Sequence, residues 1–257
     1  MKLAPDWNRT AQDYARHRAG FPDWFYDRMA ERGLLRKNAQ ILDIGTGTGY
    51  LARGFAQRGC AVTGLDVAPG MMEAARGLDT AAGVSIRYLV APAEATGLPA
   101  GTFDLVTAGT CWHWFDRPKV MAEAMRLLKP GGHLVIANLV WLQLAGNVAA
   151  ATEALIEAHN PSWHLGGWEG HSADQQRDLI EGGFVDRESA SLDYDIPYSP
   201  EAWRGRIRGS AGISASLGPD EVEKFDGELG ALLARDFPGD PIPVPHRLVT
   251  LWGRKPL

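Results

Sequence analysis

The amino-acid sequence predicts an α/β protein built on a doubly wound parallel sheet with helices on both faces. Two observations support this prediction. Short apolar runs alternate with helical patterns from about residue 39 to residue 140, and glycine or proline marks most of the junctions between them. Strands joined through helical crossovers pair in parallel, and the crossovers place their helices on the faces of the sheet. The 257 residues are enough for one large domain.

The first part of the chain is expected to hold five strands and the helices that connect them. The expected strands are residues 39–44, 61–65, 84–90, 103–108 and 133–139. A helix is expected over residues 50–58, with Gly59 in the left-handed position that follows many helices. Pro69 is expected to begin the next helix, where its missing N–H costs nothing. Apolar residues at helical spacing predict a third helix near Pro118, which the run Pro130-Gly131-Gly132 is expected to end.

The second part of the chain is less regular. Helices are expected at residues 148–159, 199–209 and 219–237, and strands at 184–195 and 246–254. Ser172 followed by Gln175 has the spacing of a capping box, which predicts the start of a helix that ends at Gly182. The helical pieces outside the strand–helix alternation are expected to form a lid over the carboxyl edge of the sheet, where open α/β sheets bind their ligands.

Composition and charge exclude several classes of function. The formal net charge is −5 and the pI about 5.8, so no overall basic field would attract nucleic acid. The longest nearly apolar stretch, residues 134–146, is too short and too polar to span a bilayer, and charged residues interrupt the N-terminus where a secretory signal would be apolar. Cys60 and Cys111 form neither a disulfide framework nor a cluster with zinc spacing. We therefore expect a cytoplasmic protein without membrane, nucleic-acid or metal partners.

A glycine-rich turn between the first strand and the first helix is the most informative motif. In Asp43-Ile44-Gly45-Thr46-Gly47-Thr48-Gly49 the glycines let the backbone approach a ligand, and the following helix aims its N–H groups at it. A dinucleotide fingerprint requires glycine where this chain has Tyr50, which disfavours a nicotinamide-dependent oxidoreductase. Asp43 suits a cationic ammonium or sulfonium group, and Asp66 at the end of the second strand can accept ribose hydroxyls. The motif favours a nucleoside with a positively charged amino-acid part.

The stretch from Ile41 to Asn138 resembles the class I S-adenosylmethionine-dependent methyltransferases. The glycine turn, Asp66 followed by Met71-Met72, and Leu127-Leu128-Lys129-Pro130-Gly131-Gly132 match this family in order and spacing. The resemblance implies a Rossmann-like sheet of seven strands, whose last strand is antiparallel to its neighbours. It also implies S-adenosylmethionine as the cofactor and S-adenosylhomocysteine as the product.

The family pattern implies roles for individual residues. Gly45 and Gly47 would approach the methionine part of the cofactor, and Asp43 would engage its amino group, directly or through water. The other residues expected at the cofactor are Asp66 on the ribose hydroxyls, Val67 and Met71 on the adenine face, Ala93, Glu94 and Thr110.

The N-terminal segment resembles the first helix of the small-molecule branch of this family. There, the side chains that match Tyr14 and Arg18 close over the cofactor carboxylate, and an arginine fork suits a carboxylate chemically. The alternative is that these two residues belong to one solvated helix face.

Two residues depart from the family pattern. Pro92 stands where the family often has an aspartate on the adenine amine, so adenine would be held by the backbone of Ala93 or Glu94 or by the Glu94 side chain. Ala68 replaces the serine that would cap the second helix.

The segment after the fourth strand, Gly109-Thr110-Cys111-Trp112-His113-Trp114-Phe115, would face the transferable methyl group. The Asn/Asp-Pro-Pro-aromatic motif of enzymes that methylate amino groups of nucleic-acid bases is absent, and Cys111 is expected to be a small buried residue rather than a nucleophile. His-Trp-Phe-Asp resembles a subgroup that includes the trans-aconitate carboxyl methyltransferases. His113 is the candidate general base, since its unperturbed pKa lies near operating pH; the alternative is a structural histidine.

Tryptophan is unusually frequent, with nine in the chain. Core and surface packing is one explanation, and a pocket for a flat or apolar ligand is the other. The residues expected to line such a substrate pocket are Trp112, Trp114, Trp141, His164, Trp168 and His171.

The leading interpretation is a methyltransferase that acts on a small-molecule metabolite, with an aromatic or apolar acceptor from specialised biosynthesis favoured by the tryptophans. The alternative is a protein of the same fold that binds S-adenosylmethionine for a non-methylating or regulatory role. We expect a monomer or homodimer with a single methyltransferase domain. Its parts would be N-terminal helices over the cofactor (1–36), a cofactor-binding core (37–140), lid elements on the substrate side (141–171 and 197–240) and the remaining core (172–196 and 241–257).

Overall fold

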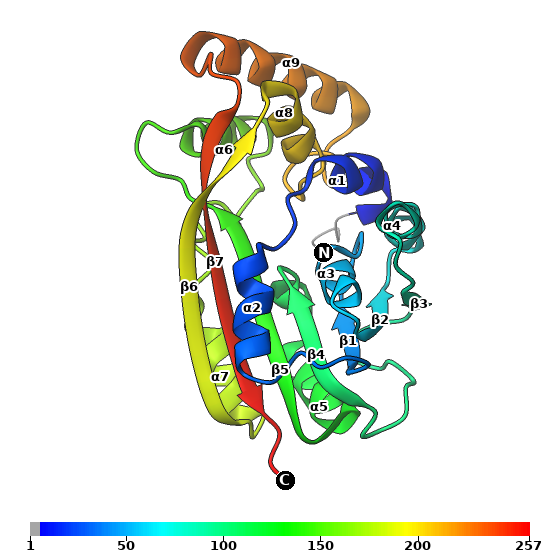
Figure 1. Cartoon of the computed structure of the whole chain (residues 1–257). Coiled ribbons are helices and arrows are strands. Elements are labelled where there is room, and N and C mark those ends of the chain that lie inside the picture. The colour runs from blue at the N-terminus through cyan, green and yellow to red at the C-terminus, as the bar shows by residue number, and fades with distance from the viewer. Residues whose placement is uncertain (1–5) are drawn as a thin grey trace. The chain divides into compact units, whose positions relative to one another are not determined.

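The computed structural model describes residues 6–257 (Figure 1). Its helices are η1 (Trp7–Thr10), α1 (Ala11–His17), α2 (Asp23–Glu31), α3 (Tyr50–Gln57), α4 (Pro69–Ala82), η2 (Trp112–Trp114), α5 (Arg117–Leu127), α6 (Val148–His159), α7 (Ala173–Glu181), α8 (Pro200–Arg208) and α9 (Pro219–Asp236). Its strands are β1 (Gln40–Ile44), β2 (Ala61–Asp66), β3 (Arg87–Val90), β4 (Phe103–Gly109), β5 (Leu128–Trp141), β6 (Val185–Tyr198) and β7 (Ile242–Arg254). The helices and strands predicted from the sequence are all present, although some bounds differ.

The described residues divide into two compact units. The larger unit comprises Gly20–Leu139, Gly170–Leu192 and Leu248–Leu257, and the smaller unit comprises Val140–Glu169, Asp193–Arg247 and the described residues before Gly20. Strands β5, β6 and β7 contribute residues to both units. Each unit has a hydrophobic core of its own.

The described strands form a seven-stranded sheet in the order β3-β2-β1-β4-β5-β7-β6. The first five strands of this order pair in parallel. In contrast, β7 is antiparallel to β5: Lys255 N–H donates to the Gly132 carbonyl and Lys255 carbonyl accepts from Gly131 N–H, while Leu142 N–H donates to the Pro245 carbonyl. The arrows of β5 and β7 accordingly point in opposite directions in Figure 1. The predicted doubly wound sheet with an antiparallel last strand is confirmed.

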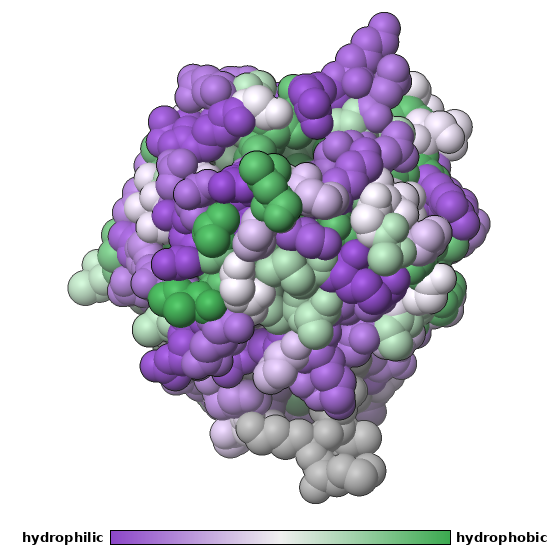
Figure 2. Space-filling model, turned by 90° about the horizontal axis from the view of Figure 1, so that it is seen from below, coloured by the Kyte–Doolittle hydropathy of each residue, from purple (hydrophilic) through white to green (hydrophobic). Residues whose placement is uncertain are grey.

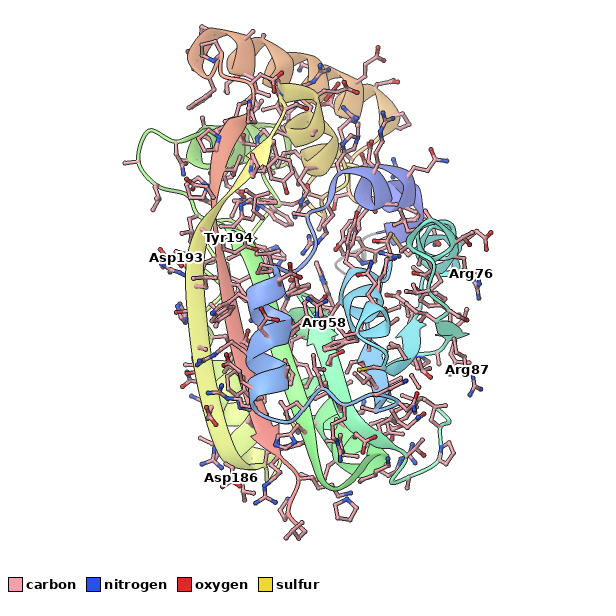
Figure 3. All side chains as sticks on the ribbon, viewed as in Figure 1. Arg58, Arg76, Arg87, Asp186, Asp193 and Tyr194 are labelled. Carbon is pink, nitrogen blue, oxygen red and sulfur yellow. The ribbon has the colours of Figure 1, made fainter. Side chains whose placement is uncertain are left out.

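Strand β6 lies at the edge of the sheet and carries exposed acidic residues. Asp186 and Asp193, labelled in Figure 3, accept hydrogen bonds from Arg254 and Arg247 of β7 at 2.8 and 2.7 Å. Charged side chains on an edge strand discourage pairing with further strands.

Helices of the larger unit cover both faces of its part of the sheet, with α2 on the near face and α5 and α7 on the far face in Figure 1. On the near side, Tyr26 of α2 packs edge-to-face on Phe55 of α3, with ring centroids 5.2 Å apart. On the far side, Gly182 after α7 lies so close to Met121 of α5 that a Cβ would overlap its side chain. The strands supply the core between these layers, including the fully buried Leu42, Val106 and Ile136.

In the smaller unit α1 packs on α8 at two glycines spaced one helical turn apart. A Cβ on Gly205 would overlap the His17 ring, and a Cβ on Gly209 would lie 3.0 Å from the backbone nitrogen of Tyr14. The missing side chains let the two helices approach closely. The core of this unit contains the fully buried Trp203, Phe225 and Ile156.

The fifth strand begins earlier than predicted. Because β5 starts at Leu128, the run Pro130-Gly131-Gly132 lies within the strand. The register with β4 shifts between Phe103 and Leu105, and Gly131 has a φ of 77°, which is typical of a bulged strand. A Cβ on Gly132 would lie 3.1 Å from the carbonyl oxygen of Asp104, a tight contact that favours glycine where the two strands approach.

Figure 2 shows one face of the molecule, where hydrophilic side chains cover most of the surface and apolar side chains are scattered among them. Val67, Val90 and Trp114 are among the large apolar side chains that remain exposed. Between residues 6 and 257, no helix combines the length and the apolar character needed to cross a bilayer.

Candidate functional site

The glycine turn between β1 and α3 has a left-handed backbone. The φ angles are 62° at Gly45, 54° at Gly47 and 75° at Gly49, a region that glycine adopts without strain. A Cβ on Gly45 would lie 2.8 Å from Cys111 Sγ, whereas a Cβ on Gly47 would have Met71 Cε at the ordinary contact distance of 3.7 Å. The turn is therefore packed tightly against the loop after β4 at Gly45 and is less crowded at Gly47.

Asp43 lies beneath this turn rather than on its surface. Its side chain is 1% exposed. Its two carboxylate oxygens accept hydrogen bonds from the hydroxyls of Thr46 and Thr107 at 2.6 and 2.7 Å. These bonds hold the carboxylate between the turn and β4.

Burial has two consequences for Asp43. It raises the pKa of the carboxyl to about 6, despite these hydrogen bonds. It also takes the side chain out of solvent, where its oxygens hold the turn through Thr46 and Thr107. Contact of Asp43 with a cofactor amino group, directly or through water, stays a prediction.

Asp66, at the end of β2, is hydrogen-bonded to the same turn. Its Oδ2 accepts from the backbone N–H of Gly47 at 2.8 Å, and its Oδ1 accepts from that of Ala68 at 2.9 Å. The second bond holds the backbone just before α4, whose N-cap residue Ala68 has no side chain that can accept a hydrogen bond. Burial raises the pKa of Asp66, yet the side chain stays partly exposed and each oxygen has a further lone pair. Asp66 can therefore accept hydrogen bonds from ligand hydroxyls.

The residues expected near an adenine ring differ in exposure. Val67 is 62% exposed, whereas Met71 and Ala93 are 3% and 4% exposed. Met71 is therefore buried, with its Cε next to Gly47 of the turn. The Glu94 side chain accepts from the backbone N–H of Asp116 at 2.9 Å and joins the loop after β3 to the start of α5. Contact of these residues with an adenine stays a prediction.

Thr110, at the end of β4, has a φ of 55°, which is uncommon for a residue with a Cβ. Its N–H donates to the Ala137 carbonyl at 2.7 Å and its hydroxyl accepts from the Leu139 N–H at 3.1 Å, so β5 holds it in place. Cys111 follows, 8% exposed, and its Sγ donates to the Ile44 carbonyl at 3.3 Å. Strained residues of this kind gather at functional sites, which makes the loop after β4 a candidate reactive edge.

His113 lies between two tryptophans with different environments. Trp112 is fully buried, and its Nε1 donates to Asp178 of α7 at 2.8 Å. In the tight turn of η2 successive side chains point in different directions, and that of Trp112 enters the core, so its role in a substrate pocket stays a prediction. Trp114 is 38% exposed, and its ring centroid lies 4.7 Å from that of His113. The role of His113 as a base stays a prediction.

Several predicted site residues belong to the smaller unit. The Arg18 guanidinium carbon lies 5.0 Å from the centre of the Tyr14 ring. Trp141 donates from Nε1 to Glu153 at 3.2 Å. His164 and Trp168 lie in the loop after α6, whereas His171 belongs to the larger unit, directly before α7. The cofactor and substrate roles of these residues stay predictions.

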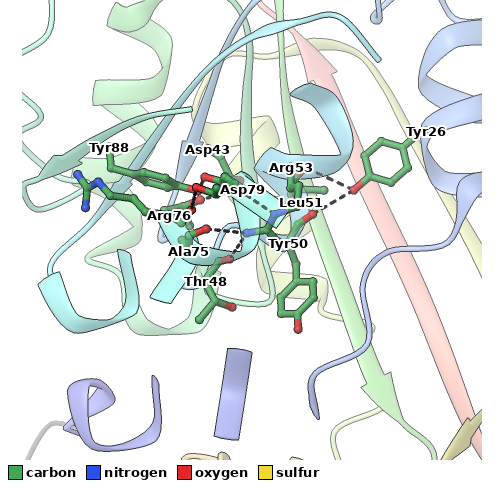
Figure 4. A network of polar contacts seen from close by, with 12 residues as sticks. Tyr26, Asp43, Thr48, Tyr50, Leu51, Arg53, Ala75, Arg76, Asp79 and Tyr88 are labelled. Carbon is green, nitrogen blue, oxygen red and sulfur yellow. Dashed lines mark hydrogen bonds and ion pairs between the residues drawn. The ribbon is translucent and has the colours of Figure 1, made fainter. Parts of the chain in front are cut away.

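A buried polar network beside the glycine turn was not among the predicted site residues (Figure 4). Arg53 of α3 donates from Nε to Asp79 of α4 at 2.8 Å, and from Nη2 to the carbonyl oxygens of Thr48 and Ala75 at 2.9 and 3.2 Å. Tyr88 of β3 donates its hydroxyl hydrogen to the other oxygen of Asp79 at 2.9 Å. No sequence pattern indicated this network, and only the structure shows that Arg53 is among the buried residues of α3.

Comparison with known proteins identifies the larger unit. Residues 42–136 match a family model described as a methyltransferase domain. Malonyl-[acyl-carrier protein] O-methyltransferase from Serratia marcescens is 35% identical over 114 residues, which are 44% of this chain and 43% of that protein. Demethylmenaquinone methyltransferase from Thermus thermophilus is 40% identical over 112 residues, which are 42% of this chain and 51% of that protein. The chain thus matches about half the length of these curated relatives.

Solved structures share the fold over most of the chain. A methyltransferase structure from Anaeromyxobacter dehalogenans has a TM-score of 0.63 at 21% identity, and the match covers 93% of this chain and 98% of that one. A phosphoethanolamine N-methyltransferase of Haemonchus contortus, in complex with S-adenosylhomocysteine, has a TM-score of 0.56 at 20% identity and covers 95% of this chain and 56% of that one. Residues 42–136 thus match a methyltransferase domain, and the chain has the fold of these solved structures.

Proposed function

We propose that this protein transfers the methyl group of S-adenosylmethionine to a small-molecule acceptor. The observation that carries the proposal is the glycine turn with Asp66 beside it. Left-handed glycines bring the backbone close to a ligand, and a partly exposed carboxylate at the end of β2 keeps lone pairs for ribose hydroxyls. These groups fit a nucleoside with a charged amino-acid part, and the family of the domain supports the same cofactor.

The residues of the chain would act mainly by positioning. When bound, S-adenosylmethionine supplies an electrophilic methyl group on a sulfonium. Asp66 would orient the ribose, and Val67 would offer an apolar surface to the adenine. The loop after β4, held by Thr110, would form the edge at which the acceptor approaches. Holding a nucleophile in line with the methyl group can supply much of the acceleration.

The first test concerns Asp66. We expect Asp66→Ala to weaken S-adenosylmethionine binding by about 1–3 kcal/mol, the scale of lost hydrogen bonds to a charged group. Titration calorimetry would measure it. Asp104→Ala is the matched control. Asp104 also accepts a hydrogen bond from a backbone N–H, that of Gln40 at 2.8 Å, but it lies at the start of its strand and not at the end. Unchanged affinity in the Asp66 variant would contradict the cofactor assignment.

The second test concerns His113. If this residue is the general base, His113→Ala lowers the methyl-transfer rate by about 10²- to 10⁴-fold while the cofactor affinity barely changes. His133→Ala, at a histidine of β5 in the same unit, serves as the control. A rate within a few-fold of the wild type would exclude His113 as the base and leave positioning as the mechanism.

The acceptor can be found by incubating the protein with isotope-labelled S-adenosylmethionine and an extract of small metabolites, then tracing the label. Transfer to a metabolite supports the proposal and names the acceptor class. Cofactor binding without transfer to any component would instead favour a non-methylating or regulatory role for the same fold.

A further inference from the structure

The hydroxyl of Tyr88 lies against the third glycine of the turn. A Cβ on Gly49 would overlap Tyr88 Oη and would lie 3.2 Å from Arg53 Nη2. Tyr88 comes from β3, the edge strand on the far side of β2 from β1. A side chain from a distant part of the sequence therefore closes the space behind Gly49.

Side chains also hold the backbone where α3 begins. The carbonyl of Thr48, just before α3, accepts from Arg53 Nη2 at 2.9 Å. Asp79 fixes the guanidinium of Arg53 through Nε, and Tyr88 donates to the other oxygen of Asp79. The side chains of Arg53 and Asp79 are only 10% and 6% exposed, so water competes little with these bonds and they remain strong.

We propose that Tyr88, Asp79 and Arg53 are positioning residues that set the affinity of the glycine turn for its nucleoside cofactor, an inference that rests on the proposed function. The contacts lead from the Tyr88 hydroxyl through Asp79 and Arg53 to the Thr48 carbonyl, and the hydroxyl itself abuts Gly49 (Figure 4). Removing that hydroxyl takes a partner from Asp79 and opens space behind Gly49. The turn then samples conformations that bind the cofactor less well, while the chemistry at the reactive edge is unaffected.

The test compares two tyrosines of the same neighbourhood. Tyr26 is 3% exposed and donates to the Leu51 and Tyr50 carbonyls of α3 at 3.3 and 3.5 Å, and it abuts Gly54 in the middle of the helix rather than a glycine of the turn. We expect Tyr88→Phe to raise the dissociation constant for S-adenosylhomocysteine about five- to twentyfold, which is less than the full loss of a hydrogen bond to a charged group because only part of that loss reaches the turn. We expect Tyr26→Phe to change it less than about twofold. At saturating cofactor, the turnover number of Tyr88→Phe stays close to that of the wild type. Equal changes in both variants, or none in Tyr88→Phe, would overturn the proposal.

A double substitution tests the contact with Gly49 directly. Gly49→Ala should weaken S-adenosylhomocysteine binding more than about tenfold, because the new Cβ overlaps the phenol oxygen and sits at a φ of 75°. Adding Tyr88→Phe removes the oxygen and should restore about threefold or more of the affinity, with the unfavourable φ keeping the rescue partial. Losses that simply add would show that the two residues are independent and would refute the contact as a determinant of affinity.

Hydrogen exchange of the free protein separates this proposal from the proposed function. The backbone amides of residues 46–50 should exchange faster in Tyr88→Phe than in the wild type or in Tyr26→Phe. If the exchange changes in this way but the wild type does not bind S-adenosylhomocysteine, the proposed function fails and the positioning of the turn stands. If the exchange at the turn is unchanged, the positioning role is refuted whatever the cofactor.

Discussion

The two units each use an arginine–aspartate contact between helices, and the contacts differ in burial and in what they hold. In the larger unit, the side chains of Arg53 and Asp79 are 10% and 6% exposed, and Arg53 also donates to two backbone carbonyls. In the smaller unit, Arg208 of α8, with a side chain 25% exposed, joins Asp13 of α1 to Asp226 of α9. Desolvation makes a buried ion pair a weak source of stability. Because the Arg53–Asp79 pair lies beside the glycine turn, we infer that it orders the backbone of the turn. The Arg208 contacts in the smaller unit instead connect helices near the surface.

The largest expected effect follows from this difference in burial. Arg53→Leu should lower the free energy of unfolding by about 3–5 kcal/mol, because it leaves the Asp79 charge buried without its cationic partner. Arg208→Leu, the matched change in the smaller unit, should lower it by about 1 kcal/mol, since solvent screens its partly exposed partners. Urea unfolding followed by circular dichroism would measure both. Similar losses in the two variants would break the contrast.

Each unit also buries a titratable group, with pKa shifts of opposite sign. Burial raises the pKa of Asp43 in the larger unit to about 6 and lowers that of His246 in the smaller unit to about 4. Folded Asp43 keeps its proton to higher pH than the unfolded chain does, so its contribution to stability is lost as the pH rises from about 4 to 6. Folded His246 resists protonation, so its contribution is lost as the pH falls from about 6.5 to 4. A shift of about two pKa units corresponds to about 3 kcal/mol in each case.

Substitution of each group should isolate its pH dependence. Relative to the wild type, the unfolding free energy of Asp43→Asn should increase as the pH rises from 4 to 6. That of His246→Asn should increase as the pH falls from 6.5 to 4, and its amide can still donate to the Val244 carbonyl that Nδ1 contacts at 2.8 Å. Urea titrations at four pH values across this range would show the slopes. Difference profiles with the same sign would contradict the opposite shifts.

The smallest expected effects concern two glycines needed for different reasons. Gly47→Ala places a Cβ at a φ of 54° without a close neighbour, so it should cost about 1–2 kcal/mol of backbone strain that no other substitution relieves. Gly205→Ala lies in a helix, where alanine is favoured by about 1 kcal/mol, but its Cβ overlaps the His17 ring. We expect a net loss of about 1 kcal/mol that His17→Ala reverses. Thermal unfolding of the single and double variants would measure these changes in stability. If His17→Ala does not restore the stability of Gly205→Ala, the overlap with the His17 ring is not the cause of the loss.

Local sequence patterns predicted the helix starts and stops well, because their chemistry is contained in a few consecutive residues. Gly59 has the predicted left-handed backbone after α3, and Pro69 begins α4. The capping box at α7 was predicted only in part. Ser172 does accept from the Gln175 backbone N–H at 3.3 Å, but the Gln175 side chain accepts from Asn138 of β5 at 2.8 Å. Local spacing had predicted that the Gln175 side chain caps the helix, but this side chain bonds to a residue of strand β5 instead.

The sequence by itself determined the alternation of strands and helices and the glycine turn. Periodicity, turn residues and the left-handed preference of glycine all act between near neighbours in the chain. Only the tertiary structure decided that Trp112 is buried, that Asp43 is buried beneath the glycine turn, and that the Tyr88 hydroxyl of β3 lies against Gly49. Burial and electrostatic environment depend on which distant segments surround a side chain, and one residue's neighbours in the chain do not specify them. The same tryptophan or aspartate can therefore line a ligand site in one packing arrangement and stabilise the core in another.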